Sequence, residues 1–229
     1  MSWNFLRLRL SEDARVIAGE NTPLLIHNVL PALHAFNKPR TTDRLALALP
    51  YMETIERRED GQVRTMGQAL SEVRLFGGAE ALEAFAEQEV IQRLTRTGMI
   101  RRLRVRAIEP EEVDGYVSYH RLRRAERHTT AGILRRERRH QRRAEQRGES
   151  RDGEAKARTH LRRRAEWERR IRAEHPTVFI PMTSSSTGGQ RFSLFVEERS
   201  VSAPQEGGLN SYGLSGGAED AQPFAVPRF

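Results

Sequence analysis

Few residue types in this sequence could act directly on a substrate, and they are scattered along the chain. His27 and His34 lie in a mostly apolar segment, a serine-rich run follows Met182, and Tyr212 lies in a glycine-rich tail. Histidine titrates near neutral pH and therefore suits proton transfer. Taken alone, however, a histidine on an apolar helix is more often structural, and a serine-rich run is usually a turn. The sequence contains no Walker loop, no His-Glu-x-x-His motif and no spacing typical of a zinc site.

Arginine is the most unusual feature of the composition. Residues 121–172 contain 20 Lys or Arg and 8 Asp or Glu, whereas the rest of the chain contains 19 basic and 23 acidic residues. The basic excess of the chain, whose formal net charge is +8, therefore lies in this one stretch, called here the arginine segment. A polyanion is the expected partner. Arginine also pairs bidentately with phosphate and with the O6/N7 edge of guanine.

The basic residues of the arginine segment recur at helical spacing. An i, i+3, i+4, i+7 pattern places them on one helical face, where like charges repel unless an anion lies against them. RNA is favoured, because arginine-rich segments are a common RNA-binding device. The major groove of regular A-form RNA is too narrow for side chains, so we expect a short stem, a loop-proximal end or a bulge. The face consists of Arg135, Arg138, Arg139 and Arg142, extended by Arg136, His140 and Arg143.

The periodicity of the apolar residues predicts an N-terminal domain over residues 1–110. Its elements follow the order β-α-β-β-α-β, which is the ferredoxin-like arrangement. Pro31 predicts a kink in the first helix. The predicted strands are residues 3–10, 44–50, a stretch within 64–76, and 99–108; the predicted helices are residues 22–36 and 79–94.

A second domain is predicted over residues 111–229, after an acidic, turn-rich stretch at 109–115. We expect it to contain the arginine helix, a second basic helix at 154–172, short strands at 178–182 and 191–196, and a glycine-rich tail at 207–217. The predicted fold class is therefore α+β. A ferredoxin-like domain is followed by an arginine-helix domain with short β-strands.

Several classes of protein are disfavoured by the composition. The chain has no cysteine, which excludes disulfides and thiolate metal sites and is compatible with a reducing compartment. No apolar run approaches the length of a membrane span, and the first residues lack the apolar core of a signal peptide. We therefore expect a cytoplasmic protein that does not associate with membranes.

The C-terminal motifs narrow this interpretation. Residues 178–188 (VFIPMTSSSTG), 190–195 (QRFSLF) and 207–215 (GGLNSYGLS) resemble the ends of the CRISPR repeat-processing endoribonucleases of type I-F systems. The order, spacing and C-terminal position of the motifs agree together. In the N-terminal half, residues 29–34 (VLPALH) match the segment in which that family keeps its catalytic histidine. The remainder is similar only in its pattern of elements.

The resemblance implies an enzyme that binds the stem-loop of each CRISPR repeat and cuts at the 3′ base of the stem. The ribose 2′-OH attacks the adjacent phosphate without a metal or other cofactor, which leaves a 2′,3′-cyclic phosphate. The enzyme then stays on the guide RNA with the other subunits of a type I-F surveillance complex. By resemblance, His34 is the general base, Ser184 and Ser186 hold the ribose, and Tyr212 is an orienting residue.

The same resemblance assigns RNA contacts. Arg124 matches an arginine that contacts a guanine edge near the stem base, and Phe192 matches an aromatic that stacks under the stem. Glu126 stands where the family has glutamine; a carboxylate cannot donate to a base, so this contact is absent or the repeat differs there. The arginine segment is also longer than in the family, and residues 218–223 are inserted. The arginine helix of the family is matched by Arg135, Arg136, Arg138, Arg139 and His140.

Two alternatives remain open from the sequence. The chain could hold the processed guide RNA hairpin without cutting it. It could also be an unrelated arginine-rich structural RNA-binding protein.

Overall fold

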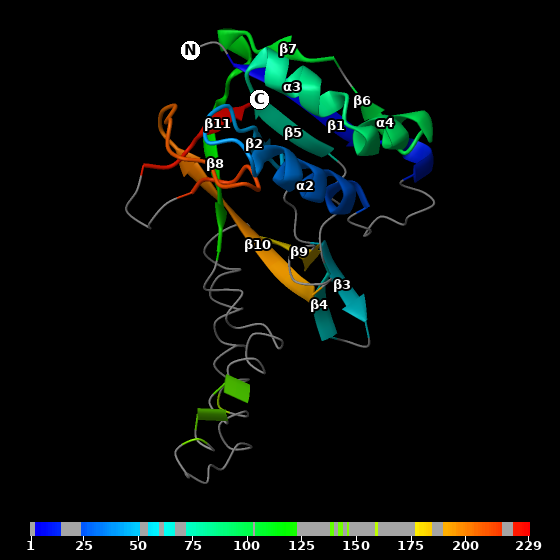
Figure 1. Cartoon of the computed structure of the whole chain (residues 1–229), viewed down its shortest axis with the longest axis vertical. Helices are drawn as coiled ribbons and strands as arrows, with labels where there is room; N and C mark the ends of the chain where they lie inside the picture. The colour runs from blue at the N-terminus through cyan, green and yellow to red at the C-terminus, as the bar shows by residue number, and fades with distance from the viewer. Residues whose placement is uncertain are drawn as a thin grey trace.

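The computed structural model contains two antiparallel sheets of more than two strands, joined by one hydrophobic core (Figure 1). It describes residues 3–14, 24–50, 55–59, 62–66, 72–102, 104–122, 138, 139, 142, 143, 146, 159, 177–184, 190–216 and 222–229.

The first sheet is built around strand β1 (Asn4–Leu10), which pairs with β5 (Glu72–Gly77) on one side and β6 (Ile100–Arg102) on the other. The order is β2-β5-β1-β6, with β2 (Ala46–Ala48) at one edge; β7 (Arg106–Ala107) also pairs with β1. Leu6, Leu8 and Leu10 are buried, as the alternation predicted. The strand at 44–50 is confirmed but is shorter than predicted.

Helices α2 (Leu24–Asn37), α3 (Ala79–Ala86) and α4 (Glu89–Arg96) cover one face of the first sheet (Figure 1). Pro31 lies inside α2, and the predicted start at Thr22 lies outside the described residues. The prediction of one continuous helix over 79–94 is wrong. Gln88 has an extended backbone (φ −60°, ψ 139°), so α3 ends and α4 begins there.

The strand predicted within 64–76 is β5, whereas the strand predicted at 99–108 is divided in two. The stretch 64–76 contains the end of β4 (Gln62–Met66) and then β5, and β4 forms a hairpin with β3 (Ile55–Glu59) that the periodicity did not indicate. The stretch 99–108 contains β6 and β7. The βαββαβ order of the ferredoxin-like arrangement is confirmed, with the β3–β4 hairpin inserted between its second and third strands.

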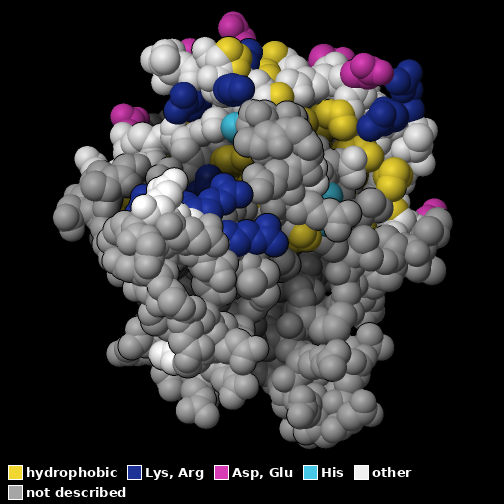
Figure 2. All heavy atoms as spheres, turned by 60° about the horizontal axis from the view of Figure 1, so that its bottom comes forward, with side chains coloured by type: hydrophobic (Ala, Val, Ile, Leu, Met, Phe, Trp, Pro, Cys, Tyr) yellow, Lys and Arg dark blue, Asp and Glu magenta, His cyan; other side chains and the backbone are white. Residues whose placement is uncertain are grey.

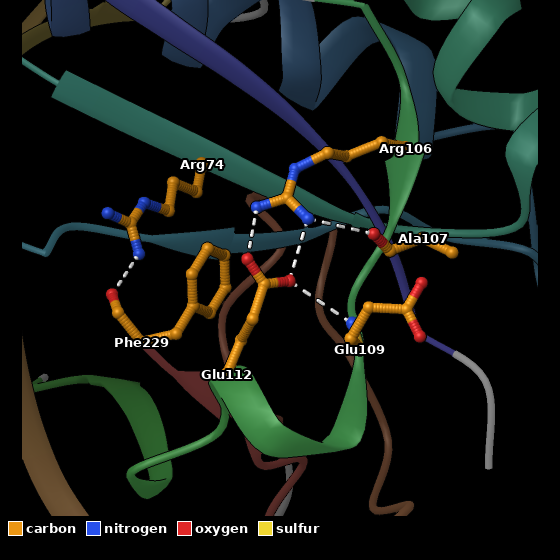
Figure 3. A network of polar contacts seen from close by, with 6 residues as sticks. All are labelled: Arg74, Arg106, Ala107, Glu109, Glu112 and Phe229. Carbon is orange, nitrogen blue, oxygen red and sulfur yellow. Dashed lines mark hydrogen bonds and ion pairs between the residues drawn. The ribbon is translucent and has the colours of Figure 1, made fainter.

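The second sheet has the order β11-β8-β10-β9. Strands β9 (Thr177–Ser184) and β10 (Gln190–Val201) confirm both predicted C-terminal strands and extend beyond them. Strands β8 (Gly115–Arg121) and β11 (Val226–Arg228) were not predicted. A short 3₁₀ helix, η1 (Pro110–Glu112), precedes β8, and Glu112 pairs with Arg106 at 2.7 Å (Figure 3).

Residues of the two sheets share the core. Val117, Ile180, Leu194 and Val226 of the second sheet belong to the same buried cluster as the leucines of β1. Only isolated residues of the arginine segment beyond Leu122 are described, and Figure 1 places those at 138–143 away from both sheets. The division at residues 110 and 111 stays a prediction.

Candidate functional site

His34 and Tyr212 form a stacked pair. Their ring centroids are 4.3 Å apart, and the planes differ by 13°. His34 lies in the last turn of α2, and Tyr212 lies in the loop between β10 and β11. The fold therefore brings the predicted base and the predicted tyrosine together, although they are far apart in the sequence.

The loop of Tyr212 is held by its own turn. The side-chain Oδ1 of Asn210 accepts hydrogen bonds from the backbone N–H groups of Tyr212 (2.8 Å) and Leu214 (3.3 Å). Gly213 has φ +71°, a conformation that suits glycine. Because Asn210 and Gly213 close the turn, the Tyr212 ring projects from a fixed backbone.

Strand β2 and the residues before it anchor the same loop to the first sheet. The N–H of Leu47 donates to the carbonyl of Gly213 at 2.8 Å, and the guanidinium of Arg44 donates to the carbonyl of Leu209. Leu214 is fully buried. The loop thus covers the β2 edge of the sheet and carries Tyr212 toward the end of α2.

Arg121, the last residue of β8, lies between two aromatic rings. Its Cζ is 5.8 Å from the centroid of Tyr212 and 6.0 Å from that of Phe192 on β10. A guanidinium at this distance from a ring face is attracted by the ring quadrupole. Phe192, predicted to stack under an RNA stem, is therefore tied to the His34–Tyr212 pair through Arg121.

The ring of His34 is half-buried, and its surroundings keep it neutral. Burial lowers the pKa of His34, and the positive charges of Lys38 and Arg121 lower it further. Its Nδ1 is buried and has no hydrogen-bond partner within the described residues. A neutral imidazole can accept a proton, which is what a general base requires.

The structure describes the two serines of the predicted site only in part. Strand β9 ends at Ser184, which pairs with Gln190 across β10; the orientation of its side chain and the whole of Ser186 lie outside what the structure describes. His27 of α2 donates a hydrogen bond to the backbone carbonyl of Pro181 on β9. Burial lowers the pKa of His27, and this hydrogen bond opposes the effect without cancelling it. This contact ties the strand that ends at Ser184 to the helix that carries His34.

Half of the ten predicted RNA contacts lie outside the described residues, namely Arg124, Glu126, Arg135, Arg136 and His140. Arg138, Arg139, Arg142 and Arg143 are exposed and lie in short helical fragments. The N–H of Gln146 bonds to the carbonyl of Arg142 at 3.1 Å, a helical spacing. Figure 2 shows histidine and basic side chains on one face of the molecule.

Two residues of the site were not predicted from the sequence. Lys38 follows His34 by one helical turn, a spacing that could have identified it. Arg121 was counted only as the first residue of the arginine segment. Its contact with Tyr212 depends on the pairing of β8 with β10, and no local pattern indicates that pairing.

Comparison with known proteins identifies the family of this chain. Within the described residues, no helix is long and apolar enough to cross a membrane. No curated protein matches the chain. A family model described as CRISPR-associated protein (Cas_Csy4) matches residues 14–229, which include the second sheet, every strand of the first sheet except β1, and the His34–Tyr212 pair. The chain therefore belongs to the Cas_Csy4 family and has the role of a CRISPR-associated, repeat-processing endoribonuclease.

Proposed function

We propose that this protein cuts precursor CRISPR RNA at the 3′ base of the repeat stem-loop, without a metal, by attack of the ribose 2′-OH. The observation that carries the proposal is the His34–Tyr212 stack, with Lys38 and Arg121 close enough to lower the pKa of the histidine. A neutral base next to two cations fits a reaction that starts with deprotonation beside a phosphate.

The reaction needs one proton acceptor and one phosphate positioned in line with the 2′ oxygen. His34 takes the proton of the 2′-OH, the 2′ oxygen forms a bond to phosphorus, and the bond from phosphorus to the 5′ oxygen breaks. The leaving oxygen takes a proton from solvent, which gives a 2′,3′-cyclic phosphate and a 5′-OH. Negative charge on the phosphate oxygens grows during the attack, and preorganised cations stabilise it.

The remaining residues position the substrate. Ser184, with Ser186 in the same loop, holds the ribose for in-line attack, and Tyr212 fixes the plane of the His34 ring by stacking. Geometry of this kind supplies much of the rate in an intramolecular attack.

RNA binding is assigned to the arginine segment and its neighbours. Arg124 contacts a base near the foot of the stem, Glu126 changes the contact next to it, and Phe192 stacks under the stem. The arginine helix contacts the phosphates of the stem. After cleavage, the protein stays bound to the product hairpin within a type I-F surveillance complex. The helix residues are Arg135, Arg136, Arg138, Arg139, His140, Arg142 and Arg143.

Cleavage of the cognate repeat hairpin in excess EDTA tests the proposal. We expect the rate to match that measured with Mg²⁺, because the groups assigned to the chemistry belong to the chain and the RNA. A 2′-deoxy substitution on the nucleotide 5′ of the cut should abolish cleavage while binding is retained. Loss of activity in EDTA, or cleavage of the deoxy substrate, would contradict the mechanism.

Replacing Lys38 with methionine should move the acid limb of the pH–rate profile to higher pH. Lys38 lowers the pKa of His34, so its removal lets that pKa rise. The base is active only above its pKa, and the variant should therefore lose activity at a pH where the parent is still active. The measurement is single-turnover cleavage from pH 5 to 8, the range in which histidine titrates.

Lys38→Arg is the control. It keeps the positive charge, so the acid limb of its pH–rate profile should lie at the same pH as in the parent. A limb that stays in place in Lys38→Met would show that this side chain does not act on His34.

A further inference from the structure

The first sheet has a second face, turned away from the helices. Leu6, Leu8 and Leu10 face the core, so the alternate residues of β1 lie on the opposite side. Arg101 of β6 pairs directly with Arg9 and shares that side. We call Arg7, Arg9 and Arg101 the outer arginine face.

The positive charge of the outer arginine face is not neutralised by the carboxylates described around it. Among the described residues, the carboxylate of Glu72 is buried beside it and already pairs with two arginines: Arg7 and Arg74 each lie 2.8 Å from one of its oxygens. Arg9 and Arg101 are exposed and make no ion pair within the described residues, although Arg9 lies opposite Glu72. The buried Nε of Arg7 also has no hydrogen-bond partner there.

This arrangement has an energetic cost that an anion would remove. Like charges directly opposite each other on neighbouring strands destabilise a sheet. A general excess of basic residues does not explain the opposed Arg9 and Arg101, because the chain outside the arginine segment has 19 basic and 23 acidic residues. An unpaired Arg9–Arg101 pair in a net-acidic part of the chain therefore indicates an anionic partner.

The aromatic end of the same face is already covered. The ring of Phe229 lies 4.8 Å from Phe5 and 6.2 Å from Phe76, and the Cζ of Arg106 lies 4.8 Å from the Phe5 ring. Arg74 bonds to the backbone oxygen of Phe229 at 2.7 Å (Figure 3). Bases cannot stack on rings that are occupied in this way. The arginine end of the face is the part left to contact RNA. Guanidinium groups pair with phosphates whatever the base sequence.

We propose that the outer arginine face binds the phosphate backbone of single-stranded RNA that adjoins the repeat stem-loop. The inference rests on the proposed function for the identity of the RNA. Contacts of this kind hold a strand without reading its bases. The contact would hold the flank on the face of the first sheet opposite to the one that α2, with His34, covers.

The test compares three RNAs that a 2′-deoxy nucleotide 5′ of the cut protects from cleavage: the bare hairpin, which ends one nucleotide 3′ of the cut, and the same hairpin with a single-stranded flank of about ten nucleotides on its 5′ or its 3′ side. For Arg9→Gln/Arg101→Gln, we expect affinity for one flanked RNA to fall about ten- to thirtyfold near 0.1 M salt. The slope of log affinity against log salt should flatten by about 0.7 for each lost phosphate contact. Affinity for the bare hairpin, and its cleavage in the ribose form, should not change.

Arg93→Gln/Arg96→Gln is the matched control. It removes the same charge from exposed positions on α4, across the sheet from the outer arginine face. The proposal is overturned if neither flank adds affinity in the parent, if both variants lose affinity equally, or if the loss extends to the bare hairpin. A change of flank sequence that alters affinity would also overturn it. Cleavage of the bare hairpin by Arg9→Gln/Arg101→Gln tests the proposed function separately.

Discussion

Replacing His34 with alanine should lower the single-turnover rate of repeat cleavage about 10²- to 10⁴-fold, the usual contribution of a positioned general base. The reason is the environment of the ring. Burial, Lys38 and Arg121 all lower its pKa, so the imidazole is neutral and ready to accept the 2′-OH proton. In the parent, activity should fall as the pH drops through this lowered pKa, and should therefore persist below the pH at which an exposed histidine becomes charged.

The His34→Ala experiment separates chemistry from binding. Affinity for the uncut hairpin should stay close to that of the parent, because the phosphate contacts are assigned to other residues. His27→Gln is the matched control: it removes a histidine from the same helix but keeps a donor for the carbonyl of Pro181. It should cut nearly as fast as the parent. If His34→Ala cuts as fast as His27→Gln, His34 is not the base.

The sequence predicted the parts of the fold that depend on local patterns. Leu6, Leu8 and Leu10 alternate and are buried in β1, and the apolar residues of 24–36 form α2. The break at Gln88 escaped prediction because the apolar positions on both sides keep a helical spacing; Leu82, Phe85, Ile91 and Leu94 are all buried. Burial alone does not reveal that two short helices replace a long one.

The site was predicted from motifs, and the structure adds contacts that motifs do not contain. His34 and Tyr212 came from resemblance to a family, and their stacking confirms only that the fold brings them together. Their roles stay predictions. The approach of Arg121 to Tyr212 requires β8 to pair with β10 and the 209–216 loop to return to β2. Both are long-range pairings, and no spacing within either segment specifies them.

Gly213 follows Tyr212 directly and packs its backbone against the residues of β2 and before it. A Cβ at Gly213 would lie 2.6 Å from the carbonyl oxygen of Leu45 and 2.9 Å from the amide nitrogen of Leu47. Both are backbone atoms, which cannot move aside as a side chain can. The φ of +71° adds strain for any residue with a Cβ.

Gly213→Ala should therefore destabilise the protein by about 2–4 kcal/mol, from left-handed strain together with overpacking. It should also slow cleavage about 10²-fold at a temperature where the variant is folded, because a shift of about 1 Å in Tyr212 disturbs the stack on His34. Gly98→Ala is the matched control: Gly98 has φ +69°, but a Cβ there meets nothing within 4 Å. It should cost about 1–2 kcal/mol and leave the cleavage rate unchanged. Thermal unfolding and single-turnover cleavage of both variants measure the two effects. If Gly213→Ala and Gly98→Ala are equally stable and equally active, the contact between the loop and β2 does not position the tyrosine.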